Sequence, residues 1–207
     1  MPSVYQLKPA FQALLRPAVR RLAGAGVTAN QVTCTAAALS VLLGGVVALW
    51  PGQRYLLLLV PVYLFARMAL NAIDGMLARE FGMKSRLGAI LNELGDVVSD
   101  AALYLPLALV GLPPALVVIA VCLGIITEFA GVLSQAISGE RRYEGPMGKS
   151  DRAVAFGLLC LWLGMGGEPT VMGFDWAWWY LAAVNTMLLV TISNRCIGGL
   201  ASADSLT

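Results

Sequence analysis

Acidic and amide side chains are concentrated in residues 71–100, a stretch that joins two runs apolar enough to cross a bilayer. An ionisable group at membrane depth is energetically costly, so its presence there indicates a functional site. Asn71 and Asp74 lie three residues apart and therefore share one face of a helix. A second set recurs every four residues on the next helix, namely Gly88, Asn92, Asp96 and Asp100. The stretch predicts two neighbouring helices whose polar faces carry a site.

The two polar faces are also matched in depth. If the chain reverses near Met83, Asn71 and Asp96 are almost equally far from the turn. The same holds for Asp74 and Asn92. Because every helical residue contributes the same rise, an antiparallel hairpin brings the four side chains level. Four oxygen donors of this kind suit Mg²⁺, Mn²⁺ or Ca²⁺ rather than zinc or copper.

The same stretch resembles the signature of the CDP-alcohol phosphotransferase family, D-x2-D-G-x2-A-R-x8-G-x3-D-x3-D. Six residues are in register with it: Asp74, Gly75, Ala78, Arg79, Gly88 and Asp96. The first and third acidic positions hold Asn71 and Asn92 instead, which leaves two of the four carboxylates. The segment GVTANQVT, residues 26–33, is similar to the one that opens the family's first membrane helix. Its polar side chains, among them Thr28 and Thr33, could cap that helix.

Composition places the chain among integral membrane proteins, since 58% of its 207 residues are hydrophobic and only 13% are charged. We expect an all-α membrane protein with six spans, because six runs are long enough to cross about 30 Å of hydrocarbon. They lie near residues 29–50, 54–80, 87–110, 112–138, 151–167 and 175–197.

The N-terminal arm, residues 1–26, differs from these runs. Between residues 3 and 22 an apolar stripe faces a basic face, which predicts an amphipathic helix on the membrane surface. An ordinary packed helix is the alternative. We therefore expect one domain over residues 1–207, with an interfacial arm at 1–26 and a six-helix bundle at 27–200.

Basic residues predict the orientation. Twelve of the fourteen Lys and Arg residues fall in the N-terminal arm, the 79–86 turn, the 139–152 loop and the C-terminal end. Cytoplasmic loops carry such an excess, so both termini and the polar site are expected on the cytoplasmic side of an inner membrane. An even number of spans agrees with this arrangement.

The 139–152 loop contains the tripeptide GKS, but it is not a phosphate-binding P-loop, because that motif needs glycine where this chain has Tyr143. What remains is a basic cluster at the cytoplasmic side: Arg141, Arg142, Lys149 and Arg152. Such residues could clamp an incoming phosphate, and basic residues near this region help to bind a phosphorylated acceptor in the family. Contact with lipid headgroups is the alternative.

Other charged residues within the predicted spans are Arg67, Glu93, Asp100 and Glu128. Buried charges must be paired, and Arg67 could neutralise Glu93 or Glu128. Asp100 could compensate for the missing carboxylates or join a polar network. Structural ion pairing and a role near the substrate both remain open for these residues.

The resemblance implies an enzyme that joins a CDP-linked lipid or alcohol to an acceptor hydroxyl and releases CMP. It implies Mg²⁺ or Mn²⁺, as one or two ions, on a pyrophosphate. The implied ligands are Asn71, Asp74, Asn92 and Asp96, with Asp74 the principal ligand and Asp96 also the general base. Gly75, Ala78, Arg79 and Gly88 would bind the nucleotide. CDP-diacylglycerol or another CDP-alcohol is the expected donor, membrane lipids surround the chain, and a homodimer is common in the family.

Some function classes are excluded or disfavoured. Histidine is absent, which removes histidine general-base catalysis and histidine metal ligands. Each Asp-to-Asn difference removes a negative charge, so metal affinity should be weak until the nucleotide arrives. A catalytically impaired family member that binds nucleotide or lipid without transfer is therefore the alternative. An ion or proton transporter has no need of the signature spacing, and no nucleic-acid partner is expected.

Overall fold

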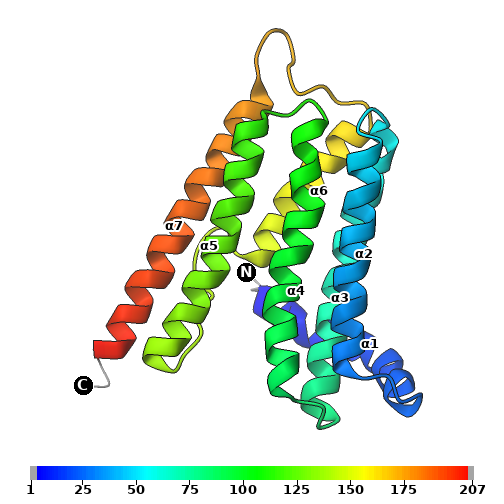
Figure 1. The fold of residues 1–207 in the computed structure, drawn as a ribbon, viewed down its shortest axis with the longest axis vertical. Coiled ribbons are helices and arrows are strands. Elements are labelled where there is room, and N and C mark those ends of the chain that lie inside the picture. Colours follow the sequence, from blue (N-terminus) through cyan, green and yellow to red (C-terminus); the bar gives the residue numbers. More distant parts are fainter. Residues whose placement is uncertain (1–3, 205–207) are drawn as a thin grey trace. The chain divides into compact units, whose positions relative to one another are not determined.

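The computed structural model describes residues 4–204 and, within them, the side chains of residues 10–203. The first three residues of the predicted N-terminal arm and the last three of the predicted domain lie outside the described residues. Seven α-helices follow one another within residues 4–204 (Figure 1): α1 (Val4–Gly24), α2 (Ala29–Leu49), α3 (Leu59–Glu80), α4 (Arg86–Tyr104), α5 (Pro114–Ser138), α6 (Lys149–Gly164) and α7 (Trp176–Asp204). Short 3-10 helices precede α3 and follow α4, namely η1 (Arg54–Leu58) and η2 (Leu105–Leu109). The all-α prediction is confirmed.

In the described part of the chain, four helices are long and apolar enough to cross a membrane: Ala29–Leu49, Arg54–Glu80, Pro114–Ser138 and Trp176–Ala203. The other two predicted spans fall on α4 and α6. Helix α4 carries the acidic face, and α6 has 16 residues, which is about 24 Å of helix against about 30 Å of hydrocarbon. The count of six spans therefore stays a prediction.

The helices form two compact units. The first unit consists of the chain up to Val41 together with Val62–Ser99, and the second consists of Leu42–Pro61 and the chain from Asp100 onward. Helices α2, α3 and α4 each contribute residues to both. The single domain over residues 1–207 stays a prediction.

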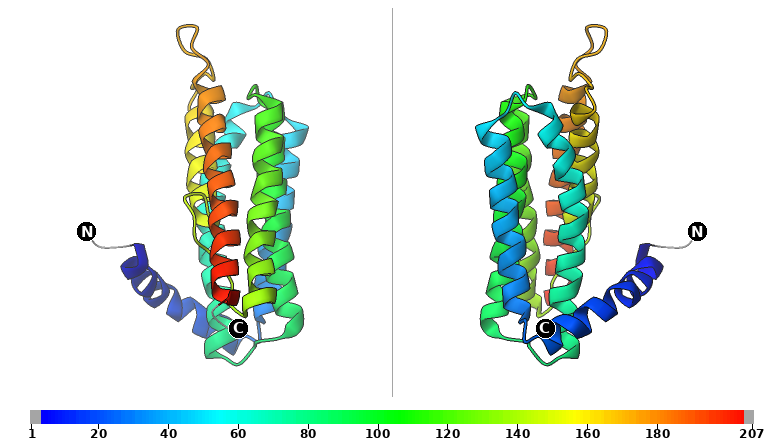
Figure 2. Two further views of the ribbon diagram at one scale, coloured as in Figure 1. Left: turned by 90° about the vertical axis from the view of Figure 1, so that its left-hand side faces the viewer. Right: turned by 90° about the vertical axis from the view of Figure 1, so that its right-hand side faces the viewer.

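In the first unit, α1 packs against α2 and α3. Val19 on α1 is fully buried and belongs to a core cluster whose other buried members are Ala29, Val32, Ile73, Met76 and Leu77. Burying one such side chain contributes about 1.5–3 kcal/mol. The rest of α1 runs obliquely to α3 (Figure 2), and its Leu14 side chain is 76% exposed. Helix α1 is thus a packed helix at Val19, and its place on a membrane surface stays a prediction.

In the second unit, α5 and α7 lie side by side (Figure 1). Ser134 on α5 donates a hydrogen bond to the main-chain oxygen of Arg195 on α7, at 3.1 Å. A Cβ on Gly199 would overlap Ser134, so glycine permits this approach. Small residues and hydroxyl groups are the usual contacts between helices in a membrane. Elsewhere in this unit the Tyr104 and Phe156 rings stack at 4.2 Å.

The adjacent glycines Gly44 and Gly45 on α2 give a matched test of packing in the second unit. A Cβ on Gly44 would overlap the main-chain carbonyl of Ala102, whereas a Cβ on Gly45 meets nothing within 4 Å. We expect Gly44→Ala to lower the free energy of unfolding by about 1–3 kcal/mol, because backbone cannot rotate away. Gly45→Ala should be neutral or stabilising by up to about 1 kcal/mol.

Thermal unfolding of the two variants in the same detergent measures this difference. A midpoint for Gly44→Ala within a degree or so of that for Gly45→Ala would contradict the close approach, since each kcal/mol corresponds to roughly 2–4 °C in a chain of this size.

Candidate functional site

The signature residues lie on two consecutive helices of the first unit. Helix α3 carries Asn71, Asp74, Gly75, Ala78 and Arg79, and helix α4 carries Gly88, Asn92, Glu93 and Asp96. The two helices run antiparallel and are joined by a short turn over residues 81–85 (Figure 1).

The helix bounds agree with the predicted match in depth. Asp74 lies six residues before the end of α3 and Asn92 six residues after the start of α4, so each is about 9 Å from the turn. Asn71 and Asp96 lie about 14 and 15 Å from it by the same rise. Asp74 is buried, whereas Asn71, Asn92 and Asp96 are half-buried.

Asp74 is held by a residue of α2. The hydroxyl of Thr33 lies 2.8 Å from Asp74 Oδ2, and it is also 3.1 Å from the main-chain oxygen of Ala29. A hydroxyl has a single proton, and a bond to a carboxylate is the stronger of the two choices. Thr33 was expected only as a possible helix cap. The cap belongs instead to Thr28, whose side chain and main chain exchange hydrogen bonds with Gln31 in a capping box.

Asp96 is paired with Arg67, which lies one turn before Asn71 on α3. One guanidinium nitrogen donates to the main-chain oxygen of Asp96 at 3.1 Å and to its Oδ1 at 3.3 Å. The Arg67 side chain is only 4% exposed. Removing one partner of such a buried pair costs about 3–5 kcal/mol, so the pair fixes α3 against α4. The sequence hypothesis paired Arg67 with Glu93 or Glu128, and the structure adds Asp96 as a partner.

Steric contacts explain why two signature positions hold glycine. A Cβ on Gly88 would lie 2.6 Å from Asn30 Oδ1, so glycine allows α4 to approach α2. A Cβ on Gly75 would lie 3.0 Å from a guanidinium nitrogen of Arg79. Glycine at position 75 therefore leaves room for the guanidinium of Arg79 to fold back against α3.

The donor atoms of the candidate ligands decide whether they suit a divalent metal ion. Within the described residues, no group of three or more His, Cys, Asp and Glu side chains could hold a metal. The candidate set is two carboxylates, Asp74 and Asp96, and two amides, Asn71 and Asn92. All four present oxygen, the donor that Mg²⁺ and Mn²⁺ prefer, so the set fits in type. Its charge of −2 balances one divalent ion and not two.

The second unit contains a buried arginine cluster, which we define as Arg141, Arg152 and Arg195 with the carboxylates Asp100 and Glu128. Arg152 lies on α6 and is only 2% exposed. Its guanidinium donates to Asp100 Oδ2 at 2.9 and 3.1 Å and to Glu128 Oε1 at 2.9 Å. It also donates to the hydroxyl of Thr127 at 3.0 Å. Asp100 therefore joins a polar network in this unit, one of its two expected roles.

The two other arginines of the cluster converge on Glu128. Arg141 reaches Oε2 at 3.0 Å, and Arg195 lies 3.7 Å from Oε1 while it donates to the main-chain oxygen of Thr127 at 2.5 Å. Three guanidinium groups thus share two carboxylates, which leaves the arginine cluster with a net charge of +1. Guanidinium groups in such a set can bind a phosphate as well as a carboxylate.

The other predicted basic residues lie near the arginine cluster in sequence but have partners of their own. Arg142 pairs with Glu144 at 2.7 Å and contacts the Ser202 hydroxyl. Burial opposes the charge of Glu144, yet hydrogen bonds from the main chain and from Arg142 hold its pKa below the ordinary value. Lys149 is half-buried at the first position of α6.

Sequence reasoning missed Arg195 as a site residue, because it was counted with the basic residues of the C-terminal end. The signal was available, since Arg195 lies within the last predicted span, residues 175–197, and is its only Lys or Arg residue. An arginine at such a position is expected to face the protein and to be paired.

Comparisons with known proteins identify the family of the chain. Residues 26–191 match the model of the CDP-alcohol phosphatidyltransferase family. The chain belongs to this family, which is the one whose signature its sequence resembles. It is 50% identical over 195 residues to the inner membrane protein YnbA of Escherichia coli K12, an alignment that covers 94% of each chain.

The fold is similar to that of phosphatidylinositol phosphate synthase (PgsA1) from Mycobacterium tuberculosis. The structure of that enzyme with CDP-DAG bound has a TM-score of 0.64 and 21% identity, and it covers 90% of this chain and 92% of its own. The structure with manganese and citrate has a TM-score of 0.67 and 20% identity, with 90% and 87% covered. At these identities the likeness establishes the fold alone.

The bond between Thr33 and Asp74 gives a prediction for the first unit. Thr33→Val keeps the shape of the side chain and removes the donor, so the free energy of unfolding should fall by about 1.5–3 kcal/mol, the value of a bond to a charged group. Thr35→Val is the matched control, because Thr35 is exposed on the same helix. Thermal unfolding in detergent measures both. Equal midpoints for the two variants would show that the bond does not hold Asp74.

Proposed function

We propose that this protein transfers a substituted phosphate group from a CDP-linked lipid, most simply CDP-diacylglycerol, to an acceptor hydroxyl and releases CMP. The observation that carries the proposal is the retained signature spacing, in which Asp74 and Asp96 project from consecutive antiparallel helices and each has a dedicated donor. A site that had lost its chemistry would not need that spacing. The solved relative with CDP-DAG bound supports the class of donor, and the one with manganese supports a divalent ion.

Asn71, Asp74, Asn92 and Asp96 are the residues that would hold the ion. When bound, a divalent cation neutralises the pyrophosphate and orients it for in-line attack. The nucleotide lies against Gly75, Ala78 and Gly88, and Arg79 contacts its phosphate.

Asp96 accepts the proton of the acceptor hydroxyl. The acceptor oxygen bonds to the phosphorus that bears the lipid, and the bond from that phosphorus to the bridging oxygen breaks as CMP leaves with the electron pair. Arg67 holds Asp96 through Oδ1, and a carboxylate has about four lone-pair positions, so one such bond leaves capacity for a hydroxyl.

The arginine cluster supports an acceptor that carries a phosphate. Guanidinium groups bind phosphate well, and Arg141 is the member best placed to reach one, because its side chain is 14% exposed against 2% for Arg152 and for Arg195. Arg152 and Arg195 position Glu128 and Thr127 beneath it. Arg142 and Lys149 add positive charge at the same loop and helix start. A lipid headgroup phosphate is the alternative ligand.

The membrane arrangement belongs to the same proposal. Helix α4 continues into η2, and the two together run from Arg86 to Leu109, about 36 Å at the helical rise and enough for a span. With α6 as the other additional span, six spans place both termini and the site at the cytoplasmic face of an inner membrane. The basic loops and the relation to an inner membrane protein support this arrangement. The homodimer common in the family is retained as part of the proposal.

CMP release tests the activity. The purified chain, incubated with CDP-diacylglycerol, Mg²⁺ or Mn²⁺ and pairs of phosphorylated and unphosphorylated alcohols, should release CMP with a phosphorylated acceptor. Asp96→Asn should lower that rate by about 10²–10⁴-fold, the usual contribution of a general base. Glu140→Gln, an exposed carboxyl of the 139–152 loop, is the control.

An unchanged rate in Asp96→Asn would remove its role as base. Nucleotide binding without CMP release from any acceptor would favour the second candidate function, a binding protein that carries out no transfer. The observation on its side is the pair of amides, Asn71 and Asn92, at two ligand positions.

Metal affinity tests the ligand set. Because the two carboxylates balance a single ion, Mn²⁺ should bind the empty protein weakly and bind more tightly once CDP supplies its own negative charge. The double change Asn71→Asp with Asn92→Asp should raise the affinity of the empty protein by about tenfold or more, which is roughly 1.4 kcal/mol. Asn194→Asp, at an exposed position of α7, is the control. Titration by calorimetry measures all four cases, and tight binding of two ions to the empty wild-type chain would refute the charge argument.

A further inference from the structure

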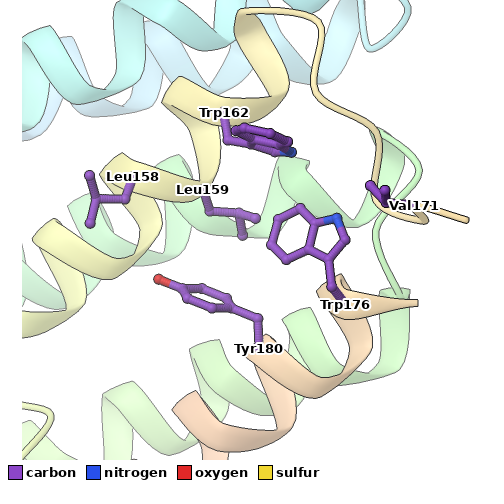
Figure 3. Close-up of a pocket in the computed structure, with 6 residues that line it drawn as sticks. All are labelled: Leu158, Leu159, Trp162, Val171, Trp176 and Tyr180. Atoms are coloured by element: carbon purple, nitrogen blue, oxygen red, sulfur yellow. The ribbon is translucent and has the colours of Figure 1, made fainter. Parts of the chain in front are cut away.

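A cavity of about 350 Å³ lies between α6, α7 and the connection that joins them (Figure 3). It is lined by Leu158, Leu159, Trp162, Val171, Trp176 and Tyr180. Trp162 and Tyr180 lie on opposite sides of it, while Leu158 and Val171 lie at its two ends (Figure 3). The volume falls within the range of about 300–1,000 Å³ that is usual for small-molecule sites. None of the lining residues belongs to the signature or to the arginine cluster.

The cavity lining offers few hydrogen-bonding groups to a polar ligand. Two of its three polar side-chain groups donate to main-chain oxygens, Trp176 Nε1 to Glu168 at 2.7 Å and the Tyr180 hydroxyl to Ala155 at 3.0 Å. The third is the indole N–H of Trp162, whose side chain is 47% exposed. The carboxylate of Glu168 is itself engaged by both guanidinium nitrogens of Arg54, at 2.6 and 3.1 Å. A nucleotide or sugar would lose many hydrogen bonds to water in this cavity and could regain at most the one that the Trp162 indole offers, so an apolar ligand is favoured.

The aromatic walls are built into the fold. Trp176 contacts both other rings edge to face, Trp162 at 6.2 Å and Tyr180 at 6.2 Å between centroids. A Cβ on Gly167 would overlap the Trp162 indole, so glycine at that position allows the chain to fold over the ring. An isolated bridge between Val171 and Phe174 shapes the connection at the far end. The cavity is therefore preformed.

The surroundings identify the occupant. Trp176 begins a helix that is long and apolar enough to span a membrane, and neighbouring Trp178 and Trp179 are exposed. Tryptophan gathers where hydrocarbon meets headgroups. The rim is exposed and apolar, since Leu158 is 58%, Trp162 47% and Val171 46% exposed. In a bilayer this rim faces lipid, so acyl chains lie next to a preformed apolar opening.

We propose that this cavity binds one acyl chain of a bilayer phospholipid, as a site separate from the one that handles the CDP-linked donor. The inference does not depend on the proposed transfer reaction. It requires only that α7 spans a bilayer and that the cavity excludes polar ligands.

Photolabelling of the full chain in lipid nanodiscs tests it. The probe is a phosphatidylcholine with a diazirine near the end of one acyl chain, and labelled peptides are mapped by mass spectrometry. We expect label concentrated on the lining residues of α6 and α7. Leu158→Trp, which fills one end of the cavity, should lower that label by about tenfold, the loss of occupancy that roughly 1.4 kcal/mol produces.

Two further variants make the outcome decisive. Leu161→Trp, an exposed position of α6 outside the lining, is the matched control and should leave the label unchanged. Val171→Trp fills the cavity from the connection instead of a helix, and it decides the question if Leu158→Trp does not fold. Label spread evenly over all apolar helix faces, or unaffected by both filling variants, would overturn the proposal. So would cross-links from these residues to a second copy of the chain, because they would mark a dimer face.

Discussion

Pairing of buried charge governs this structure, because a carboxylate among apolar helices is tolerated only where a donor or cation meets it. Asp74 has the Thr33 hydroxyl, Asp96 has Arg67, and Glu128 has the arginine cluster. Each of these contacts joins residues far apart in the chain, so each one also fixes the distance and rotation between two helices. Packing between apolar helix faces has little preference for one rotation of a helix about its axis over another, whereas an ion pair requires a particular rotation. The same residues that form the candidate site therefore determine how its helices pack.

The sequence predicted the helices of the site well, because their information is local. The three- and four-residue spacing places Asn71, Asp74, Asn92 and Asp96 on single helix faces, and the turn sets their depth. The partners were less predictable, since Thr33 and Asp74 are 41 residues apart and nothing in the sequence indicates that they meet. Arg67 was expected to neutralise Glu93 or Glu128, but depth says nothing of rotation about a helix axis, and the structure adds Asp96 as a partner.

The membrane spans show a different limit. Average hydropathy identifies α2, α5 and α7. It also identifies α3 taken together with η1, because a largely apolar stretch precedes Asn71. It is weaker for α4, where the functional carboxylates themselves lower the mean, and for α6, which is short and begins with Lys149, Asp151 and Arg152. A polar face alone does not prevent recognition, since α3 carries Asn71 and Asp74 and is still recognised. Helix α4 is missed because no long apolar stretch accompanies its polar face. Helix α1 was ambiguous for the opposite reason, since one apolar stripe suits both a membrane surface and the packing of Val19 against α2 and α3.

Charge is unbalanced in the same sense in both units once a cation is considered. In the first unit the two carboxylates of the candidate ligand set would balance at most one divalent ion, and Asp96 is already paired with Arg67, so any further positive charge would need an anionic substrate. In the second unit three guanidinium groups exceed two carboxylates by one charge. Under the proposed function, the pyrophosphate of the donor provides the additional negative charge in the first unit. A phosphate on the acceptor provides it in the second unit. Asn71 and Asn92 then need not indicate a failed site: amides at these positions shift negative charge from the protein to the donor, so that the metal and the nucleotide assemble together.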